Sequence, residues 1–185
     1  MKIIKMKKEN IKILKEGGIG VVMTDTIYGV LGSAFKPKTV EKIYILRKRD
    51  KKKPFIILIS SKKDLQKFGI KINKDIRKIL DKYWPGKVSV ILPSPSSKFN
   101  YLHRGKKTLA FRLPKNKKLK DILKKTGPLV APSANLEGKS PAKNIKEAKI
   151  YFAKKVDFYE SGKKSNSNPS KIIIIKNGKE LVLRK

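Results

Sequence analysis

Apolar positions along this chain recur at two spacings, one typical of helices and one typical of strands. Apolar residues three or four apart predict helices over Ile3–Lys15, from Pro37 through Leu46, and over Lys62–Phe68, Lys74–Tyr83, Lys117–Lys125 and Ile145–Ala153. Short apolar runs predict strands over Ile19–Met23, Phe55–Ile59, Val88–Leu92, Leu109–Leu113, Leu129–Ala131 and Val156–Tyr159, with a hairpin of Ile172–Ile175 and Leu181–Leu183. This alternation predicts an α/β fold with mixed strand directions.

Two segments follow neither spacing. Pro93–Lys107 and Ser161–Lys171 are rich in Ser, Asn, Pro or Gly, which disfavour regular structure. Long loops in compact domains often close over a ligand, so both segments are predicted to be mobile lids.

Polar side chains follow the first predicted strand directly. The apolar run Ile19–Met23 stops at Thr24, Asp25 and Thr26, and Gly29 lies a few residues on. In open α/β sheets, ligands bind beyond the carboxyl ends of the strands, which makes this segment a candidate site. Taken alone, the same residues are explained more simply by an ordinary Asp and Thr turn, because such turns are common.

Composition limits the chemistry that the chain performs. Its 185 residues are 39% hydrophobic, enough for one compact domain. No apolar run reaches the roughly 18 residues that span a bilayer, and the amino end lacks a signal-peptide core. We therefore expect a soluble, cytoplasmic protein without a membrane partner. The chain has no cysteine and one histidine, His103, which excludes thiolate catalysis and a histidine metal cluster.

The formal net charge is +34, from 48 basic and 14 acidic residues. A field of this size attracts polyanions such as nucleotides and RNA. The lysines are spread over nearly every predicted helix, however, and charged helix faces are often merely solvated. The charge alone therefore names no ligand.

Common nucleotide-binding signatures are missing, but basic side chains stand beside several apolar runs. The chain has no phosphate-loop, dinucleotide-binding or nucleophile-elbow motif. Arg47, Lys48 and Arg49 close the second predicted helix, and Lys51–Lys53 precede the Phe55 strand. The forked guanidinium of arginine suits phosphate oxygens. The carboxyl end of a helix also favours basic residues without any ligand. Arg112 lies within an apolar strand, where a guanidinium is costly unless it meets an anion.

Small and polar residues follow the strand at Leu129. Ala131, Ser133 and Asn135 belong to a loop that is followed by Ser140. Small side chains let a ligand approach the backbone, while Ser and Asn supply hydrogen bonds. A plain helix cap has a similar composition.

Together, these clusters resemble the YrdC-like family, the threonylcarbamoyladenylate synthases of tRNA modification. The family motifs correspond, in order, to Met23–Gly29, Arg47–Arg49, Lys53–Phe55, Trp84–Ser89, Thr108–Pro114, Ser133–Asn135, Pro169–Ser170 and Arg184. The order holds over nearly the whole chain, and the length matches the short form of the family. Departures from the usual motif residues occur at Met23, Arg47, Leu58, Lys87, Ser89, Glu137 and Lys171.

The resemblance implies a single YrdC-like domain, with a twisted mixed sheet flanked by helices and a basic concave ligand face. It implies a reaction in which L-threonine, bicarbonate and ATP give threonylcarbamoyladenylate and pyrophosphate, with Mg²⁺ accompanying ATP. No dedicated acid or base is implied, because the chemistry needs mainly positioning and charge neutralisation. A downstream threonylcarbamoyl transferase would use the product.

The same resemblance assigns substrates to individual residues. Threonine is expected to contact Thr26, Arg112, the backbone of Ala131, and Ser170. ATP is expected to contact Arg49, Lys53, Thr108, Ser133, Ser140 and Arg184, with Arg47 and Asn135 as second choices.

Two other functions stay open at this point. The family fold is similar to a binder of double-stranded RNA, so the chain could bind that RNA or tRNA without synthase activity. Related domains also occur in carbamoyl-transferring hydrogenase maturation factors. Those domains lie in larger chains with acylphosphatase and zinc-finger parts, for which this sequence has neither length nor cysteines.

Overall fold

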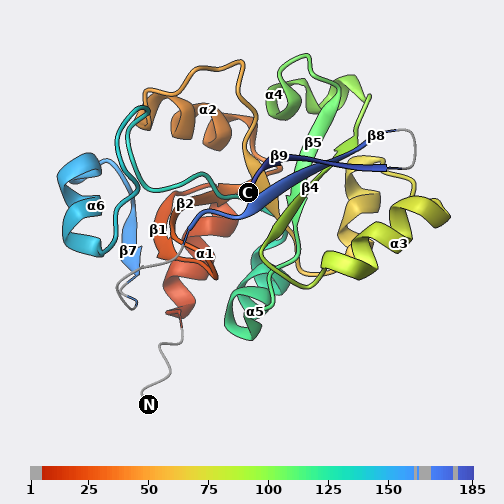
Figure 1. Cartoon of the computed structure of the whole chain (residues 1–185). Helices are drawn as coiled ribbons and strands as arrows, with labels where there is room; N and C mark the ends of the chain where they lie inside the picture. The colour runs from red at the N-terminus through yellow and green to blue at the C-terminus, as the bar shows by residue number, and fades with distance from the viewer. Residues whose placement is uncertain (1–5, 161, 163–167, 177–178) are drawn as a thin grey trace.

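The fold is a nine-stranded mixed sheet with helices on both faces (Figure 1). The structure, a computed structural model, describes residues 6–160, 162, 168–176 and 179–185. The strands are β1 (Gly20–Met23), β2 (Tyr28–Ser33), β3 (Ile56–Leu58), β4 (Val88–Pro93), β5 (Thr108–Arg112), β6 (Leu129–Val130), β7 (Phe158–Glu160), β8 (Lys171–Lys176) and β9 (Lys179–Arg184). The helices are α1 (Lys8–Glu16), α2 (Pro37–Leu46), α3 (Lys74–Tyr83), α4 (Asn100–His103), α5 (Lys117–Thr126) and α6 (Ile145–Phe152), with short 3₁₀ turns η1 (Lys62–Phe68) and η2 (Ser97–Phe99).

Strand order across the sheet is β7-β1-β2-β6-β3-β5-β4-β8-β9. The pairs β1 and β7, β3 and β5, and β4 and β8 are parallel, and the remaining neighbours are antiparallel. The mixed strand directions predicted from the sequence are confirmed.

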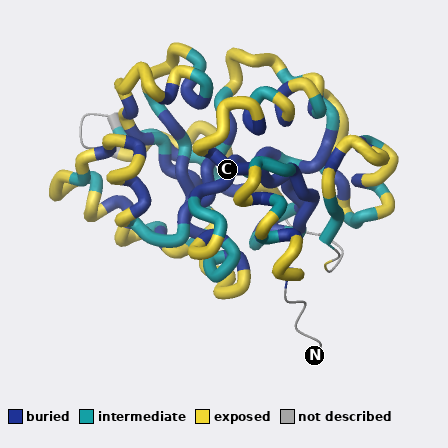
Figure 2. Tube along the Cα trace, turned by 180° about the vertical axis from the view of Figure 1, so that it is seen from behind, coloured by how far each residue is buried: buried dark blue, intermediate teal, exposed yellow. Residues whose placement is uncertain are grey.

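The two faces of the sheet are covered to different extents. One face packs on α2, α3, α4 and α6 and forms the larger core cluster, which includes Val30, Ile57 and Phe111. The opposite face packs on α1 and α5 through a smaller cluster that includes Leu58 and Leu129. Figure 2 shows that buried positions concentrate in the central strands. Half-buried apolar side chains of β3, β5, β4 and β8 lie beyond this second cluster, so part of that face stays uncovered.

Local signals set most helix ends. Gly17 closes α1 in the left-handed conformation with φ of 101°, which glycine adopts without strain. The side chains of Asn73, Asn116 and Asn144 each accept a backbone N–H at the start of α3, α5 and α6. Because these caps depend on nearby residues alone, the helices predicted over 74–83, 117–125 and 145–153 agree within about a residue with α3, α5 and α6. The first helix was predicted too long at its start: α1 begins at Lys8, where no side chain caps it, and residues 6 and 7 are not helical.

Strand β2 is the main element that the sequence pattern missed. Tyr28–Ser33 contains Gly29 and Gly32, and all six positions are buried, so it shows neither alternation nor strong strand composition. A Cβ on Gly32 would lie 2.6 Å from the Cγ2 of Thr39 in α2. The glycine is therefore needed for contact with a helix that the strand pattern does not reveal.

Pro93–Lys107 is not the mobile lid that its composition predicted. It contains η2 and α4, and Phe99, Leu102 and His103 are 3%, 3% and 1% exposed. The Phe99 ring lies 5.3 Å from that of Phe68 in the larger core cluster. Packing at distant positions overrides the loop-like composition. Most of the other expected lid, Ser161–Lys171, lies outside the described residues.

No helix in the described part of the chain is long and apolar enough to cross a membrane.

Replacing Phe99 tests whether its segment belongs to the core. Phe99→Ala is expected to lower the free energy of unfolding by about 3 to 4 kcal/mol, because it leaves a cavity beside Phe68. Phe35→Ala is the matched control, since Phe35 stacks on the same ring at 4.9 Å but is 39% exposed. Urea unfolding measures both, and equal losses for the two variants would contradict the assignment of Phe99 to the core.

Candidate functional site

A cavity of about 150 Å³ opens on the sheet face that α1 and α5 leave partly uncovered. Several loops converge on it: the β1–β2 turn, the segments after α2 and β6, and the segment before β8. Its lining residues are Thr24, Thr26, Ile27, Gly29, Arg47, Arg49, Pro54, Phe55, Ile56, Arg112, Ala131, Pro132, Ser133, Pro169, Ser170, Ile172 and Arg184.

The β1–β2 turn supplies threonine hydroxyls to the cavity. Thr24 donates through Oγ1 to the carbonyl of Ile27 at 2.6 Å, and its Oγ1 lies 3.1 Å from that of Thr26. Thr26 in turn accepts a hydrogen bond from the Nη1 of Arg112 at 3.0 Å. The segment is therefore both a turn and part of the cavity wall, and its expected role in binding a ligand stays a prediction.

Arg112 ends β5 and meets an anion within the protein. Its Nη2 lies 3.0 Å from the Oδ1 of Asp25, and both side chains are nearly buried, with 5% and 7% exposed. The anion that a guanidinium in an apolar strand requires is thus supplied, at least in part, by the Asp25 carboxylate. The Nε of Arg112 is buried and has no hydrogen-bond partner among the described residues.

Burial and pairing oppose each other at this ion pair. Burial raises the pKa of Asp25, while Arg112 and then Lys87 lower it. Burial lowers the pKa of Arg112, and Asp25 raises it. Lys87 stands where the family motif has proline, so this departure adds a second cation near the Asp25 carboxylate.

Arg47 is the more poorly compensated buried cation. Only 2% of it is exposed, and burial, followed by the charge of Arg49, lowers its pKa to about 10. The guanidinium stays protonated at neutral pH. Its Nη1 is buried without a hydrogen-bond partner among the described residues. Because Arg47 lines the cavity and has no carboxylate partner among the described residues, its charge favours an anion there.

Asn135 orients Arg47. Its Oδ1 accepts from Nη2 of Arg47 at 2.8 Å, and its carbonyl accepts from Nε at 2.9 Å. Its Nδ2 donates to the carbonyls of Leu136 and Lys139. The Asn135 amide is thus engaged inside the protein, whereas Ser133, which accepts from Arg47 at 3.2 Å, lines the cavity.

Arg184, at the end of β9, holds the segment before β8 in place. Its Nη2 donates to the carbonyl of Ser170 at 2.7 Å, and its Nε donates to the same oxygen at 3.0 Å. The hydroxyl of Ser170 lies 2.9 Å from that of Ser89, where the family motif has threonine. These contacts hold Ser170 at the cavity, directly before the start of β8.

The arginines around the cavity lie within one another's electric field. After burial, Arg49 lowers the pKa of Arg184, and Arg184 lowers that of Arg112. Asp25 offsets the charge of Arg112 but does not itself line the cavity. The cavity therefore has an excess of positive charge that favours an anionic ligand.

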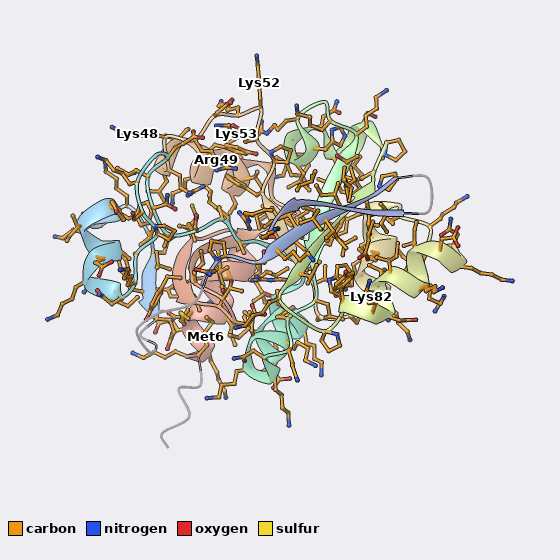
Figure 3. All side chains as sticks on the ribbon, in the orientation of Figure 1. Met6, Lys48, Arg49, Lys52, Lys53 and Lys82 are labelled. Atoms are coloured by element: carbon orange, nitrogen blue, oxygen red, sulfur yellow. The ribbon has the colours of Figure 1, made fainter. Side chains whose placement is uncertain are left out.

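A basic loop borders the cavity after α2. Lys48, Arg49, Lys52 and Lys53 lie on it (Figure 3). The Nζ of Lys53 lies 2.7 Å from the Oε1 of Glu137, and the other carboxylate oxygen of Glu137 accepts from a backbone N–H of the loop at 2.6 Å. Glu137, which replaces a serine of the family motif, thus ties this loop to the loop after Asn135.

The structure brings together most, but not all, of the site residues expected from the sequence. Those that line the cavity are Thr26, Arg47, Arg49, Arg112, Ala131, Ser133, Ser170 and Arg184. Those outside its lining are Lys53, Thr108, Ser140 and Asn135. Thr108 begins β5 on the same sheet face as Arg112, and Ser140 is exposed.

Sequence reasoning missed several residues with a clear structural part in the site. Asp25 was part of the family motif, but it received no role because its partner, Arg112, lies more than eighty residues away in the sequence. Gly29 lines the cavity, and a Cβ there would lie 3.3 Å from the carbonyl oxygen of Pro132. Its position at the end of the Thr-rich turn was the only sequence signal.

Leu58 packs in the smaller core cluster and is fully buried. It does not line the cavity, although longer family members place a substrate-facing histidine at this position. Within the described ranges, no group of three or more His, Asp or Glu side chains could hold a metal ion.

Comparison with known proteins supports the family resemblance. The family model described as telomere recombination, Sua5_yciO_yrdC, matches residues 12–185. A Methanocaldococcus jannaschii protein, named provisionally as a threonylcarbamoyl-AMP synthase, is 30% identical over 183 residues, covering 96% of this chain and 86% of that protein.

Solved structures share the fold. Pyrococcus abyssi Sua5, complexed with L-threonine, matches with a TM-score of 0.87 at 24% identity and covers 95% of this chain. The chain spans about half of that protein, 52% of its length. Escherichia coli YciO matches with a TM-score of 0.84 at 21% identity, covering 96% of this chain and 87% of YciO. From its motifs, its fold and the model match over residues 12–185, the chain belongs to the YrdC/Sua5 family.

Proposed function

We propose that this chain is an L-threonylcarbamoyladenylate synthase that serves threonylcarbamoyladenosine modification of tRNA. The observation that carries the proposal is the small cavity lined by two buried guanidinium groups, Arg47 and Arg112, each of which has one nitrogen without a hydrogen-bond partner among the described residues. An amino-acid carboxylate and a phosphate are the two anions that such a pair suits. The names of the relatives support the same activity.

The proposed chemistry forms two bonds. The amine of threonine captures carbon dioxide derived from bicarbonate, losing a proton to give a carbamate. A carbamate oxygen then attacks the α-phosphorus of ATP, and the bond to the departing pyrophosphate breaks. The protein positions the reactants and neutralises phosphate charge, which needs neither a thiolate nor a histidine.

Threonine is proposed to lie on the side of the cavity nearest β5. There, Arg112 binds its carboxylate, and Thr26, the Ala131 backbone and Ser170 surround the rest. Thr26 and Asp25 hold the guanidinium in place, so that its remaining donor faces a fixed position.

ATP is proposed to extend from the cavity over the basic loop. A volume of about 150 Å³ suits an amino acid better than a whole nucleotide, so part of ATP lies outside. Arg47 and Arg49 are placed for phosphate oxygens. The other proposed contacts are Lys53, Thr108, Ser133, Ser140, Arg184 and Asn135. Mg²⁺ would enter on the phosphates and would neutralise charge on them.

A second candidate function is binding of tRNA or double-stranded RNA. Its support is the exposed basic loop with Lys48, Lys52 and Lys53 beside the cavity (Figure 3). RNA affinity that falls steeply with salt, in a protein that consumes no ATP, would favour this function over the synthase.

Pyrophosphate release is expected to require ATP, threonine and bicarbonate together. Omitting either co-substrate removes the nucleophile, so release should fall to the level without enzyme. A coupled pyrophosphate assay, with mass spectrometry for the mixed anhydride, measures this. Equal release from ATP alone would point to a different enzyme.

Arg112→Lys is expected to weaken threonine binding by about 2 to 3 kcal/mol, on the order of a hundredfold, while ATP affinity changes much less. Lysine keeps the charge but cannot bond Thr26, Asp25 and a carboxylate in one plane. Calorimetric titration measures both ligands. Arg77→Lys, on the exposed side of α3, is the matched control and should change neither affinity. If Arg112→Lys lowered the affinities for threonine and ATP equally, the assignment of Arg112 to the threonine site would be wrong.

Asp25→Asn is expected to lower the free energy of unfolding by about 3 kcal/mol, because it leaves the Arg112 charge buried without its anion. Threonine should then raise the unfolding midpoint more for the variant than for the original protein, since its carboxylate replaces the lost charge. Asp75→Asn, an exposed carboxylate on α3, is the control. If Asp25→Asn left the free energy of unfolding unchanged, the ion pair with Arg112 would not contribute to the stability of the fold.

A further inference from the structure

Glu137 is a carboxylate held among the cations that border the cavity. Its Oε1 lies 2.7 Å from the Nζ of Lys53, and its Oε2 accepts from the backbone N–H of Asp50 at 2.6 Å. Its own backbone N–H donates to the carbonyl of Arg47 at 2.9 Å. Both oxygens of the side chain are therefore held at the basic loop, one by an ammonium group and the other by a backbone donor.

The charge of Glu137 acts on more than the one cation that it contacts. The bond with Lys53 is the main cause that holds the pKa of Glu137 below its usual range, followed by the bond with the Asp50 N–H. The charge of Arg49 acts in the same direction. Burial, and then Arg49, lower the pKa of Arg47, whereas the charge of Glu137 raises it. Glu137 is therefore ionised at neutral pH and lies in the electric field of both arginines.

The same three cations are those proposed above for the phosphate oxygens of ATP. Arg47 and Arg49 line the cavity, and so does Pro54, the neighbour of Lys53. A phosphate that approaches Lys53 meets a carboxylate already bound there, and two anions at one ammonium group repel each other. The position of Glu137 therefore opposes the binding of a second anion at the basic loop.

We propose that Glu137 is a resident anion, which phosphate groups displace from Lys53 and which thereby weakens the binding of both ATP and pyrophosphate. The inference rests on the proposed function, because it takes the phosphates of ATP as the ligand of the basic loop. When phosphate binds, Lys53 pairs with it, and Glu137 keeps its bond to the Asp50 N–H. As pyrophosphate departs, Glu137 pairs with Lys53 again, which favours release of the product.

The exposure of this ion pair suits such an exchange. The side chains of Lys53 and Glu137 are 57% and 27% exposed, and ion pairs in contact with water contribute little to stability. The pair of Arg112 with Asp25 is different, since separating two nearly buried charges leaves each without compensation. A multiply charged phosphate therefore competes readily for Lys53, while the ion pair beside the cavity stays in place.

Glu137→Gln tests the proposal without using activity. Glutamine removes the charge and keeps the shape, so its amide oxygen still accepts from the Asp50 N–H. Calorimetric titration with inorganic pyrophosphate and with ATP, each with and without Mg²⁺, is expected to show both affinities rising about threefold to tenfold. Threonine affinity should stay unchanged. A loss of affinity that appears only with Mg²⁺ would assign Glu137 to the metal ion and overturn the proposal.

Glu180→Gln is the matched control. Glu180 lies 3.0 Å from the Nζ of Lys82, and the two side chains are 31% and 58% exposed, close to the values for the pair at the basic loop. Lys82 lies on a different part of the molecule from Lys53 (Figure 3). The control removes the same charge from the chain, and because distant charges are screened by salt it should change both affinities by less than about twofold.

Lys53→Gln tests whether Glu137 acts through this lysine. In that background, Glu137→Gln should raise the affinities by less than about twofold, because the ammonium group that the two anions share is gone. Equal affinities for the original protein and Glu137→Gln, or the full gain in the Lys53→Gln background, would overturn the proposal. Failure of the proposed synthase would show separately, as no pyrophosphate release from the three substrates, because the pyrophosphate titration needs no turnover.

Discussion

The buried ion pair of Arg112 with Asp25 is the constraint on which the rest of the site depends. It joins the end of β5 to the β1–β2 turn, and the two side chains leave only 5% and 7% of their surface exposed. Such a pair is costly to desolvate and is stable only when both charges keep their partners. The threonine hydroxyls of the turn supply part of that support, because Thr26 accepts from Arg112 and neighbours Thr24. The turn and the strand end therefore form one unit, and the cavity has a rigid charged floor.

The cavity beside this ion pair exists because helices α1 and α5 cover only part of one face of the sheet. Helices α1 and α5 pack over β1, β2, β6 and the end of β3, where Leu58 and Leu129 form their contacts. Beyond Leu58, the next position on the same face of β3 is Ile56, which lines the cavity and pairs with Ala110 of β5. The cavity thus opens where, in the described part of the chain, the packing of α1 and α5 on this face ends.

Sequence analysis predicted what depends on nearby residues. The caps at Gly17, Asn73 and Asn144 set helix ends, and the apolar runs located most strands. Contacts between distant segments could not be predicted from the sequence pattern. Gly32 of β2 lies against α2, and Phe99 packs on Phe68. In the site, the family motifs located most cavity residues. They gave no means to see that Asp25 already pairs with Arg112, or that Glu137 pairs with Lys53, because both pairs join segments more than eighty residues apart.

Charge balance distinguishes the two buried arginines. Arg112 has a carboxylate partner, so a ligand there must share its guanidinium with Asp25. Arg47 has neutral partners, Asn135 and Ser133, and lies in the field of Arg49. A multiply charged anion is therefore stabilised most near Arg47, because its charge offsets the repulsion between Arg47 and Arg49. A single carboxylate suits Arg112, whose charge Asp25 already offsets in part. The two arginines therefore give one cavity two different electrostatic environments, which a uniformly positive surface would not have.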